Sequence, residues 1–534
     1  MENKRKSVFS LKFLLSRQSL LQASALVIFC SFLGKILGYL REVVIAKYLG
    51  ATQLTDAFFL AQVIPVLGAG IITNAFPLAF IPFYLTAKQK DEESAQKLAS
   101  AIFWGVVFYL SIISLVIITF SYPLARIIAP GFSGEQLLLT RKFLIFLLPS
   151  LVFQGLMGFF ASYLQAQKHF LFPAIGAALL NLPMVLVIAY LSHKHPVYSL
   201  VLGFNLGFFV YCIVLLPAAF CFKFNPLLSF NFFSPLVKKF FILVLPVAIG
   251  SSLSYIDMLI ARAVASGFGE GVISSLNYAY RLMGIPLSLI AGSIGVAVFP
   301  FMSSEAVSLD IKALAKETIR TLRATWLISL PVAVIFIALP QPLIRVMFER
   351  GAFTAENTKV TADILAFFAP GIPAMTAWAI ASRAFYSLGD TITPLKIGII
   401  QIAIDISLLL ILPRFMGYRG LPLATSFSIS IGFLILWYVL CKRIPDLKKE
   451  TLPLSFAKIT VMCAVQGCTI YFLKNFFPFN SSAKFLGNLL SLCELGGISF
   501  LFYLTVGYLI AYPEIDSIKR KFINVFIRML KRIS

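Results

Sequence analysis

Long apolar stretches constrain the fold of this chain more than any other feature. Of its 534 residues, 59% are hydrophobic and 13% are charged, whereas a soluble domain is about half apolar and a quarter charged. Stretches of about 20 apolar residues, broken by charged residues, Pro or Gly, are typical of membrane-spanning helices. This composition excludes a soluble enzyme, a secreted disulfide scaffold and a receptor with a single anchor. It predicts an all-α polytopic membrane protein.

The apolar stretches predict about fourteen transmembrane helices. Their expected ranges are 22–47, 57–86, 97–121, 140–166, 170–192, 197–222, 234–262, 272–303, 319–340, 360–388, 393–413, 418–441, 452–474 and 485–512. The second and eighth are long and contain Pro65, Pro77 and Pro286, so we expect kinks there.

The distribution of basic residues predicts the sidedness. The net charge is +23, which in a membrane protein reflects cytoplasmic loops and not a nucleic-acid partner. With the N-terminus inside, 28 of the 45 Lys and Arg residues fall on the inner side, 13 on the outer side and 4 within spans. We therefore expect both termini in the cytoplasm, with the basic segment from Lys519 to Arg532 resting on anionic headgroups.

Motifs for catalysis and for tight metal binding are missing from the sequence. None of the seven cysteines forms a CxxC pair, and the three histidines do not form a metal-ligand set. No P-loop, nucleophile elbow or HExxH is present. We expect no enzyme activity, no cofactor and no firm metal site, so any transport would draw on an ion gradient (Na⁺ or H⁺), the membrane potential or a substrate gradient.

Two halves of the chain resemble each other. Pro149 and Pro173 have the same spacing in the sequence as Pro370 and Pro394. Such repeats are typical of transporters whose site lies between two lobes near mid-membrane. We expect two pseudo-symmetric six-helix lobes and two additional C-terminal helices. The predicted segments are a basic N-tail (1–21), an N-lobe (22–225), a C-lobe (226–445), helices 13 and 14 (446–512) and a basic C-tail (513–534).

The first span carries charges at bilayer depth. At 100° per residue, Lys35, Glu42, Gly38, Gly34 and Arg41 share one face, and the opposite face is aliphatic. Charged side chains inside a membrane usually face water or the protein interior and are functional candidates. The alternative is a structural ion pair of Lys35 or Arg41 with Glu42 between helices.

The eighth and eleventh spans add further polar groups. Ser274 and Arg281 lie on one face of the eighth, and Arg281 has no carboxylate at i±3 or i±4. Either a carboxylate across the bundle or an anionic substrate neutralises it, and converging cations suit a phosphate or pyrophosphate. Asp257, Gln401 and Asp405 could hold Na⁺ or relay a proton. The alternative for Gln401 and Asp405 is interhelical hydrogen bonding.

At these residues the chain resembles the bacterial lipid II flippase family (MurJ), a branch of the multidrug/oligosaccharidyl-lipid/polysaccharide exporter superfamily. The resemblance covers residues 20–445 and is carried by GKILGYLREVVIAKYLGATQLTDAFFLAQVIP, YIDMLIARAVASG, LNYAYRLMGIPLSLIAGSIGVAVFPFMS, MFERGAFTAENT and AFYSLGDTITPLKIG. It implies two six-helix lobes around a cationic cavity, with a groove at helices 13 and 14 for a polyprenyl tail.

The resemblance also implies roles for single residues. Arg41 and Arg281 match cavity arginines of the family, and Lys35 stands where an arginine is usual. Asp56 matches the aspartate of the family's TDAFF motif, and Ser274 matches a cavity serine. The other implied positions are Glu42, which replaces an aspartate, and Asp257 and Asp405, which match carboxylates of a sodium site.

The second span departs from the family pattern. Family members commonly carry an arginine pair there, and this chain has Gly68, Ala69 and Gly70, with Asn74 as the remaining polar residue. Gly284 also stands where another family charge can occur. One cation of the implied cavity is therefore missing.

The resemblance implies a flippase of the bacterial plasma membrane that moves undecaprenyl-pyrophosphate-linked peptidoglycan precursor (lipid II) to the outer leaflet, and we expect it to work by alternating access. The expected cavity residues are Lys35, Arg41, Glu42, Asp56, Asn74, Ser274 and Arg281. Expected partners are lipid II or a related polyprenyl-linked glycan, membrane lipids and other cell-wall synthesis proteins. The alternatives are a flippase for another polyprenyl-linked oligosaccharide and an ion-coupled drug exporter, which the basic face of the first span disfavours.

Overall fold

The computed structural model describes residues 20–516, except 71, 74–75, 228, 232, 450–451 and 478–484. Every regular element within these residues is a helix. By contacts, the chain divides into two compact units, which we call the first unit (residues 1–274 and 350–353) and the second unit (275–349 and 354–534). The expected tails at 1–19 and 517–534 lie outside the described residues.

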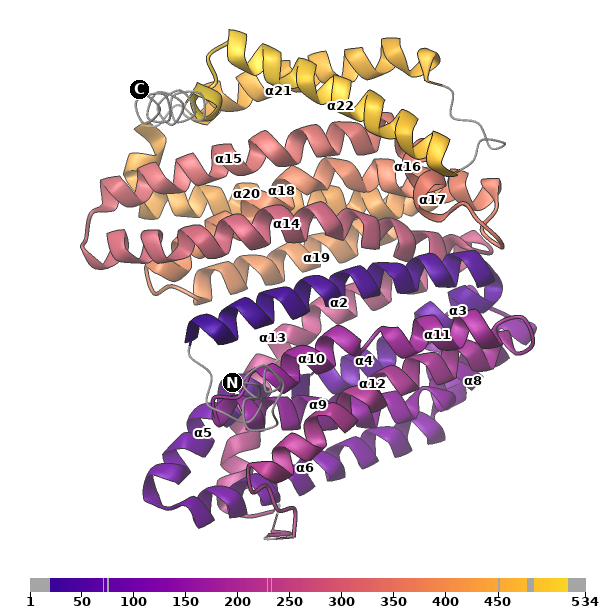
Figure 1. Cartoon of the computed structure of the whole chain (residues 1–534), viewed down its shortest axis with the longest axis vertical. Coiled ribbons are helices and arrows are strands. Elements are labelled where there is room, and N and C mark those ends of the chain that lie inside the picture. The colour runs from indigo at the N-terminus through magenta and orange to yellow at the C-terminus, as the bar shows by residue number, and fades with distance from the viewer. Residues whose placement is uncertain are drawn as a thin grey trace, which may run out of the picture. The chain divides into compact units, whose positions relative to one another are not determined.

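Helices of the first unit follow one another with short connections (Figure 1). They are α2 (Leu20–Leu49), α3 (Gln53–Ala61), α4 (Val63–Gly70), α5 (Phe76–Lys90), α6 (Glu92–Thr119), α7 (Ser121–Ile128), α8 (Gly134–Phe146), α9 (Leu148–Ala166), α10 (Leu171–Leu179), α11 (Leu182–Leu191), α12 (Pro196–Cys221), α13 (Pro235–Ala265) and η2 (Ser266–Phe268).

The second unit contains most of α14 and the helices that follow it. They are α14 (Val272–Val307), α15 (Ile311–Ala338), α16 (Pro340–Phe348), α17 (Ala355–Phe368), η3 (Ala369–Gly371), α18 (Ile372–Ser387), α19 (Ile392–Met416), η4 (Gly417–Arg419), α20 (Gly420–Arg443), η5 (Pro445–Lys449), α21 (Leu452–Leu473), η6 (Lys474–Phe476) and α22 (Phe485–Leu509). α21 and α22 pack side by side, in yellow in Figure 1.

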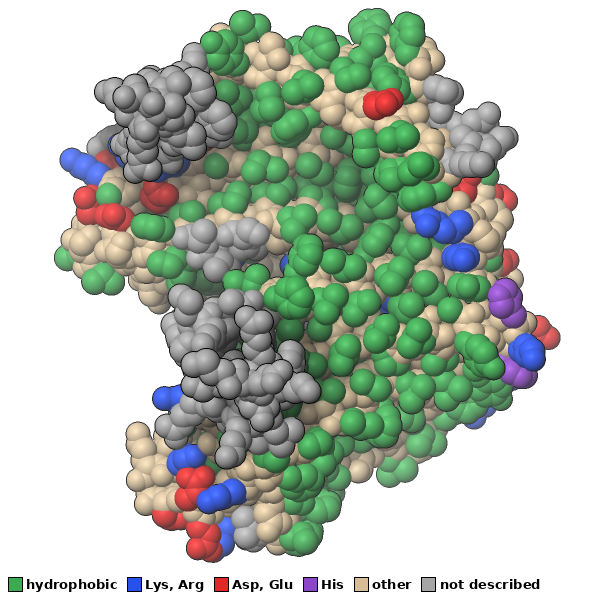
Figure 2. Space-filling model, in the orientation of Figure 1, with side chains coloured by type: hydrophobic (Ala, Val, Ile, Leu, Met, Phe, Trp, Pro, Cys, Tyr) green, Lys and Arg blue, Asp and Glu red, His purple; other side chains and the backbone are tan. Residues whose placement is uncertain are grey.

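Ten helical stretches of the described residues are long and apolar enough to cross a membrane. One of them, 392–443, joins two predicted spans, and α2, α13 and α14 fill three more predicted ranges without being among the ten. Hydrophobic side chains dominate the face shown in Figure 2, and charged ones gather toward helix ends. The all-helical, multi-pass fold is therefore confirmed, and the number of fourteen crossings stays a prediction.

The order of elements repeats along the chain. α6 begins at Glu92 and α15 at Ile311, and both are capped by an aspartate: Asp91 accepts from the Ser94 amide, and Asp310 from the Ala313 amide at 2.9 Å. Short helices α7 and α16 follow them, and broken pairs α8–α9 and α17–α18 come next. This correspondence supports the repeat. The two compact units meet at residue 274 because they are defined by contacts within each unit and not by the repeat. The predicted boundary between the lobes, at 225/226, therefore stays a prediction.

Proline acts differently in the two spans where we expected kinks. The predicted span 57–86 is divided into α3, α4 and α5. By contrast, α14 continues as one helix through Pro286 and Pro300. A membrane helix tolerates an internal Pro where neighbouring groups satisfy the freed carbonyl.

Candidate functional site

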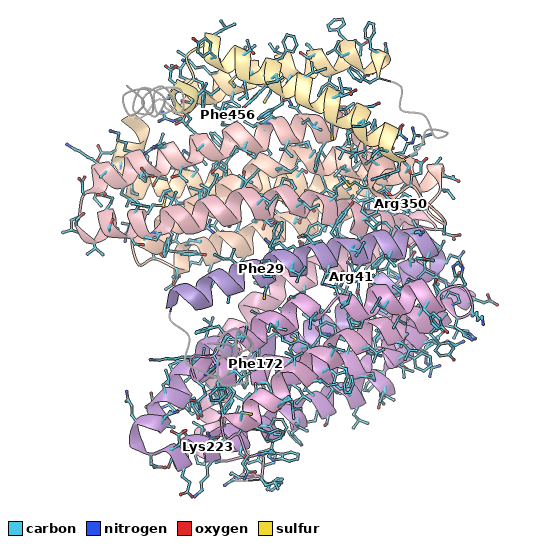
Figure 3. The ribbon with its side chains drawn as sticks, viewed as in Figure 1. Phe29, Arg41, Phe172, Lys223, Arg350 and Phe456 are labelled. Atoms are coloured by element: carbon cyan, nitrogen blue, oxygen red, sulfur yellow. The ribbon has the colours of Figure 1, made fainter. Side chains whose placement is uncertain are left out.

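Arg41 lies on α2 (Figure 3). Two side chains hold its guanidinium. Its Nη1 donates to Oδ1 of Asn181 at 2.9 Å, and its Nη2 pairs with the carboxylate of Glu42. Glu42 is fully buried, and 15% of the Arg41 side chain remains exposed. Arg41 and Glu42 therefore form an ion pair within α2. The structural alternative that we named was an ion pair between two helices.

Asn181 occupies the break between α10 and α11. α2 approaches this break closely. A Cβ added to Gly38 would lie 3.3 Å from Nδ2 of Asn181, and one added to Gly34 would lie 3.3 Å from the Ala177 carbonyl oxygen. The glycines of the polar face therefore bring α2 against its neighbour. The sequence indicates the break through Asn181-Leu182-Pro183, a signal that our prediction of one span at 170–192 did not use.

Two predicted cations lie at solvent- or lipid-accessible positions. Lys35 is exposed on α2, and Arg281 is exposed on α14. Lys35 belongs to the first unit and Arg281 to the second. Convergence of these residues and Arg41 on one cavity stays a prediction.

Asp56 caps a helix that lies far from it in the sequence. Its Oδ2 accepts from the Gly271 amide at 2.6 Å, and its Oδ1 accepts from the amide and hydroxyl of Ser274 at 2.7 and 2.6 Å. The Gly271 amide lies directly before α14 and the Ser274 amide lies in its first turn, where N–H groups have no intrahelical acceptor. Asp56 and Ser274 are fully buried. We expected both to line a cavity; the structure places them in a buried cap, and their role as cavity residues stays a prediction.

Around this cap, backbone segments approach at contact distance, and glycine makes the approach possible. A Cβ on Gly131 would lie 2.3 Å from the Ser266 carbonyl oxygen, and one on Gly351 would lie 2.2 Å from the Lys47 carbonyl oxygen. The Gly131 amide donates to Oγ of Ser266 at 2.9 Å, and the amide of Ala352 donates to the Lys47 carbonyl at 2.7 Å.

In each of these contacts, a loop of one repeat meets a helix of the other repeat. The loop after α7 rests on the end of α13, and the corresponding loop after α16 rests on the end of α2. We call the set of segments 47–56, 129–134, 262–274 and 350–353 the crossed cluster. All four belong to the first unit. The motif MFERGAFTAENT contains Gly351, but its partner at the end of α2 is not visible in the sequence pattern.

Packing explains why the second span has glycines where family members commonly carry an arginine pair. A Cβ on Gly68 would lie 2.9 Å from Cδ1 of Leu151, and one on Gly70 would lie 3.0 Å from Cε2 of Tyr255. A long basic side chain at Gly68 or Gly70 would require these neighbours to move. Asn74 lies outside the described residues.

The proposed ion ligands are divided between the two units. Asp257 is partly buried on α13, and Asp405 is buried on α19. Gln401 donates to Oγ of Ser428 at 3.1 Å, which is the interhelical alternative that we left open for it. Within the described residues, no group of three or more His, Cys, Asp or Glu side chains could hold a metal ion. A Na⁺ site at Asp257 and Asp405 stays a prediction.

Comparisons with known proteins agree with this architecture. A sequence model of the family described as lipid II flippase MurJ matches residues 45–489. A Rhizobium tropici relative, named a probable lipid II flippase MurJ, is 28% identical over 500 residues, covering 91% of this chain and 93% of the relative. A Burkholderia cenocepacia relative, named lipid II flippase MurJ, is 28% identical over 424 residues, covering 77% of this chain and 82% of the relative.

Solved structures show the same fold. A lipid II flippase MurJ in an inward closed conformation is 25% identical with a TM-score of 0.78, covering 91% of this chain and 99% of that chain. An inward-facing MATE-family multidrug transporter is 16% identical with a TM-score of 0.65, covering 78% of this chain and 96% of that chain. The MATE likeness concerns the fold alone. Because the family model matches most of the chain and reaches across both repeats, the chain belongs to the lipid II flippase MurJ family.

Proposed function

We propose that this protein moves lipid II from the inner to the outer leaflet of the bacterial inner membrane. The observation that carries the proposal is the family match, which extends from residue 45 to residue 489 and includes helices of both repeats. The family is one of transporters, and the ten apolar helices fit a multi-pass protein of that membrane. The protein would act as a carrier and not as an enzyme.

The headgroup would bind through its pyrophosphate. Lys35, Arg41 and Arg281 would provide the positive charge, and an arginine can grip two phosphate oxygens at once. Arg41 supports this role because its guanidinium has five N–H donors, of which Asn181 and Glu42 engage only part. Two fixed partners would hold it in one orientation before substrate arrives, which reduces the ordering cost of binding.

Alternating access would require the crossed cluster to open. With cytoplasmic termini, the ends of α2 and α13 and the loops after α7 and α16 would all lie on the outer side. The buried contacts of Asp56 and Gly351 would then close the outer exit while the headgroup enters from the cytoplasm. Release would require these contacts to break, with Asp56 and Ser274 exposed only in that second state.

The remaining expectations concern coupling and partners. Na⁺ at Asp257 and Asp405, H⁺ or the membrane potential would drive transport, and the potential contributes about 2.3 kcal/mol per charge per 100 mV. The pair α21–α22 would guide the polyprenyl tail. Other cell-wall synthesis proteins would supply or consume the substrate.

A second candidate is a flippase for another polyprenyl-linked glycan. The observation that favours it is the tight packing of Gly68 and Gly70, which leaves the second span without the arginine pair common in the family. A cavity with fewer basic side chains would suit a substrate whose headgroup is smaller or less charged. An exporter of cationic drugs is disfavoured, because α2 presents basic side chains.

Complementation separates these candidates. We would express the protein in a strain depleted of its own lipid II flippase and measure growth and the lipid II accessible to a hydrolase added outside the cytoplasmic membrane. The parent should restore both, whereas Arg41→Ala and Arg281→Ala should restore neither. Arg320→Ala, at an exposed position of α15, serves as the matched control and should behave as the parent. Failure of a normally expressed parent would favour the other glycan.

A further inference from the structure

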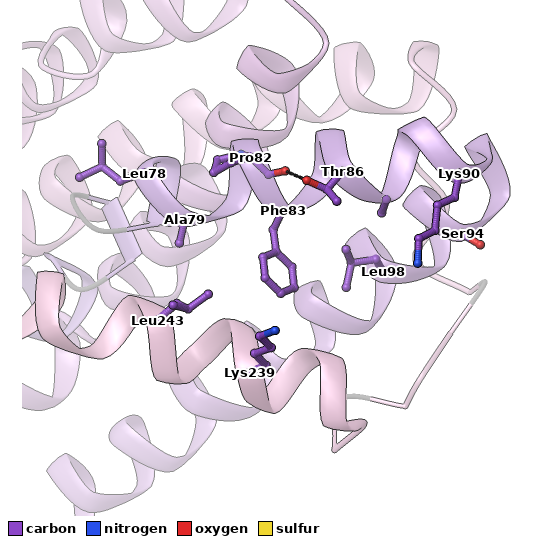
Figure 4. Close-up of a pocket in the computed structure, with 11 residues that line it drawn as sticks. Leu78, Ala79, Pro82, Phe83, Thr86, Lys90, Ser94, Leu98, Lys239 and Leu243 are labelled. Carbon is purple, nitrogen blue, oxygen red and sulfur yellow. Dashed lines mark hydrogen bonds between the residues drawn. The ribbon is translucent and has the colours of Figure 1, made fainter.

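A groove of about 680 Å³ runs along α5 in the first unit (Figure 4). One wall is a stripe of α5 side chains from Leu78 to Lys90, and α6 and α13 form the other walls. Leu78 and Leu243 lie toward one end, and Lys90 and Ser94 lie at the other. Lys239 of α13 enters the groove near Phe83. The groove therefore has an apolar end and a polar end.

The two lysines in this groove differ from the other lysines nearby. Lys88 pairs with Glu92 at 3.2 Å, and Lys97 pairs with Glu93 at 2.6 Å. Neither Lys90 nor Lys239 forms an ion pair with any described residue, and none of the described residues that line the groove carries a carboxylate.

The acidic residue that follows Lys90 in the sequence already has hydrogen-bond partners. Asp91 accepts from the amide of Ser94 and, at 2.7 Å, from its hydroxyl. Thr86 is also satisfied locally, since its hydroxyl donates to the Pro82 carbonyl at 2.9 Å. The groove thus offers two ammonium groups, Lys90 at its polar end and Lys239 beside Phe83, to an anion that comes from outside the protein.

The length of the groove fits one leaflet. Leu78 and Lys90 lie near opposite ends of the same helix, and their separation corresponds to a rise of about 18 Å at 1.5 Å per residue. Half of a hydrocarbon core is about 15 Å. With the cytoplasmic termini proposed above, Lys90 lies at the inner headgroup level and Leu78 toward mid-membrane. An acyl chain would lie along the apolar end while its phosphate meets the lysines.

We propose that this groove binds one anionic diacyl phospholipid of the cytoplasmic leaflet, with its phosphate between Lys90 and Lys239 and one acyl chain along α5. This site rests on the proposed orientation in the membrane. Each lysine near an anionic lipid surface contributes about 1 kcal/mol, or about fivefold in affinity. Bound lipid would add a contact between α5 and α13, which already pack through the ring of Phe240 against Phe76, Phe80 and Phe83.

The test uses native mass spectrometry of the full-length protein titrated with dioleoyl phosphatidylglycerol or dioleoyl phosphatidylcholine. The parent should retain one phosphatidylglycerol more tightly than phosphatidylcholine. Lys90→Ala/Lys239→Ala should weaken phosphatidylglycerol binding about 25-fold. Lys238→Ala/Lys312→Ala removes the same charge at exposed positions outside the groove and should match the parent. Ala79→Trp, which fills the apolar end without changing charge, should also prevent retention.

Three outcomes would overturn this proposal. They are equal retention of the two lipids by the parent, equal behaviour of the two double variants, and displacement of phosphatidylglycerol by equimolar lipid II, which would make the groove a substrate site. Binding is measured without transport, so a failure here is distinct from a failure of the complementation experiment. A parent that complements but shows no lipid preference would overturn the lipid site alone.

Discussion

The cap that Asp56 provides to α14 gives the sharpest quantitative prediction. In Asp56→Ala, the amides of Gly271 and Ser274 lose their acceptor, whereas the Ser274 hydroxyl keeps Oγ of Thr55 at 2.8 Å. A buried donor without a partner costs about 1–3 kcal/mol. Two such donors predict that local opening of the first turn of α14 becomes easier by about 2–6 kcal/mol. This is a large part of a typical net stability of about 5–15 kcal/mol.

Hydrogen–deuterium exchange of the purified protein measures this opening directly. We expect the segment containing Gly271 and Ser274 to exchange at least about thirtyfold faster in the variant, which corresponds to the lower bound of about 2 kcal/mol. Asp56→Asn keeps one acceptor oxygen and should fall between the parent and the alanine variant.

Another aspartate that caps a helix offers a control for this one. Asp310 is exposed and accepts one amide, that of Ala313, at the start of α15. Asp310→Ala should therefore lose only an ordinary N-cap, worth about 1 kcal/mol, or about fivefold in local exchange. If the two alanine variants accelerated exchange by the same factor, the buried carboxyl would not be what holds α14, and the reasoning would be wrong.

Three further predictions concern other parts of the fold. Gly351→Ala, whose Cβ would meet backbone at 2.2 Å, should lower the thermal midpoint of the purified protein by several degrees more than Gly417→Ala, which has a similar positive φ and open space. Asn181→Leu should reduce lipid II transport while expression is kept, because Arg41 loses its acceptor; transport equal to the parent would contradict the positioning role. The amide and hydroxyl of Thr393 hold the pKa of Asp390 below its ordinary value, so its stabilising effect is present above the unfolded-state pKa and is lost as the pH falls through the folded-state pKa. Asp390→Asn should flatten the acid side of a stability–pH curve, and an unchanged curve would refute this.

Periodicity and composition were sufficient to predict the helical class, the ranges of most helices and the repeat. These features depend on local sequence, since about 20 apolar residues must form a helix in a bilayer whatever lies elsewhere. The ion pair of Arg41 with Glu42 could also be predicted from the sequence, because the two residues are neighbours.

The contacts of Asp56 and Gly351 could not be predicted in the same way. Their partners, Gly271 and Lys47, lie in distant parts of the sequence, and a single sequence gives no information on which loop meets which helix end. The family resemblance suggested a cavity role for Asp56 and Ser274, but burial in a cap became visible only in three dimensions.

The crossed cluster also affects how the protein is made. Residues 350–353 complete the first unit, yet α14, α15 and α16 are synthesised between Ser274 and this segment. At about 5–20 residues per second, the ribosome needs about 4–16 seconds to synthesise that interval. During this time the end of α2 lacks the segment that will contact Lys47 and Gly50. A truncated N-terminal half would therefore be an incomplete domain, and the nascent chain offers quality-control proteases a defined interval in which to act.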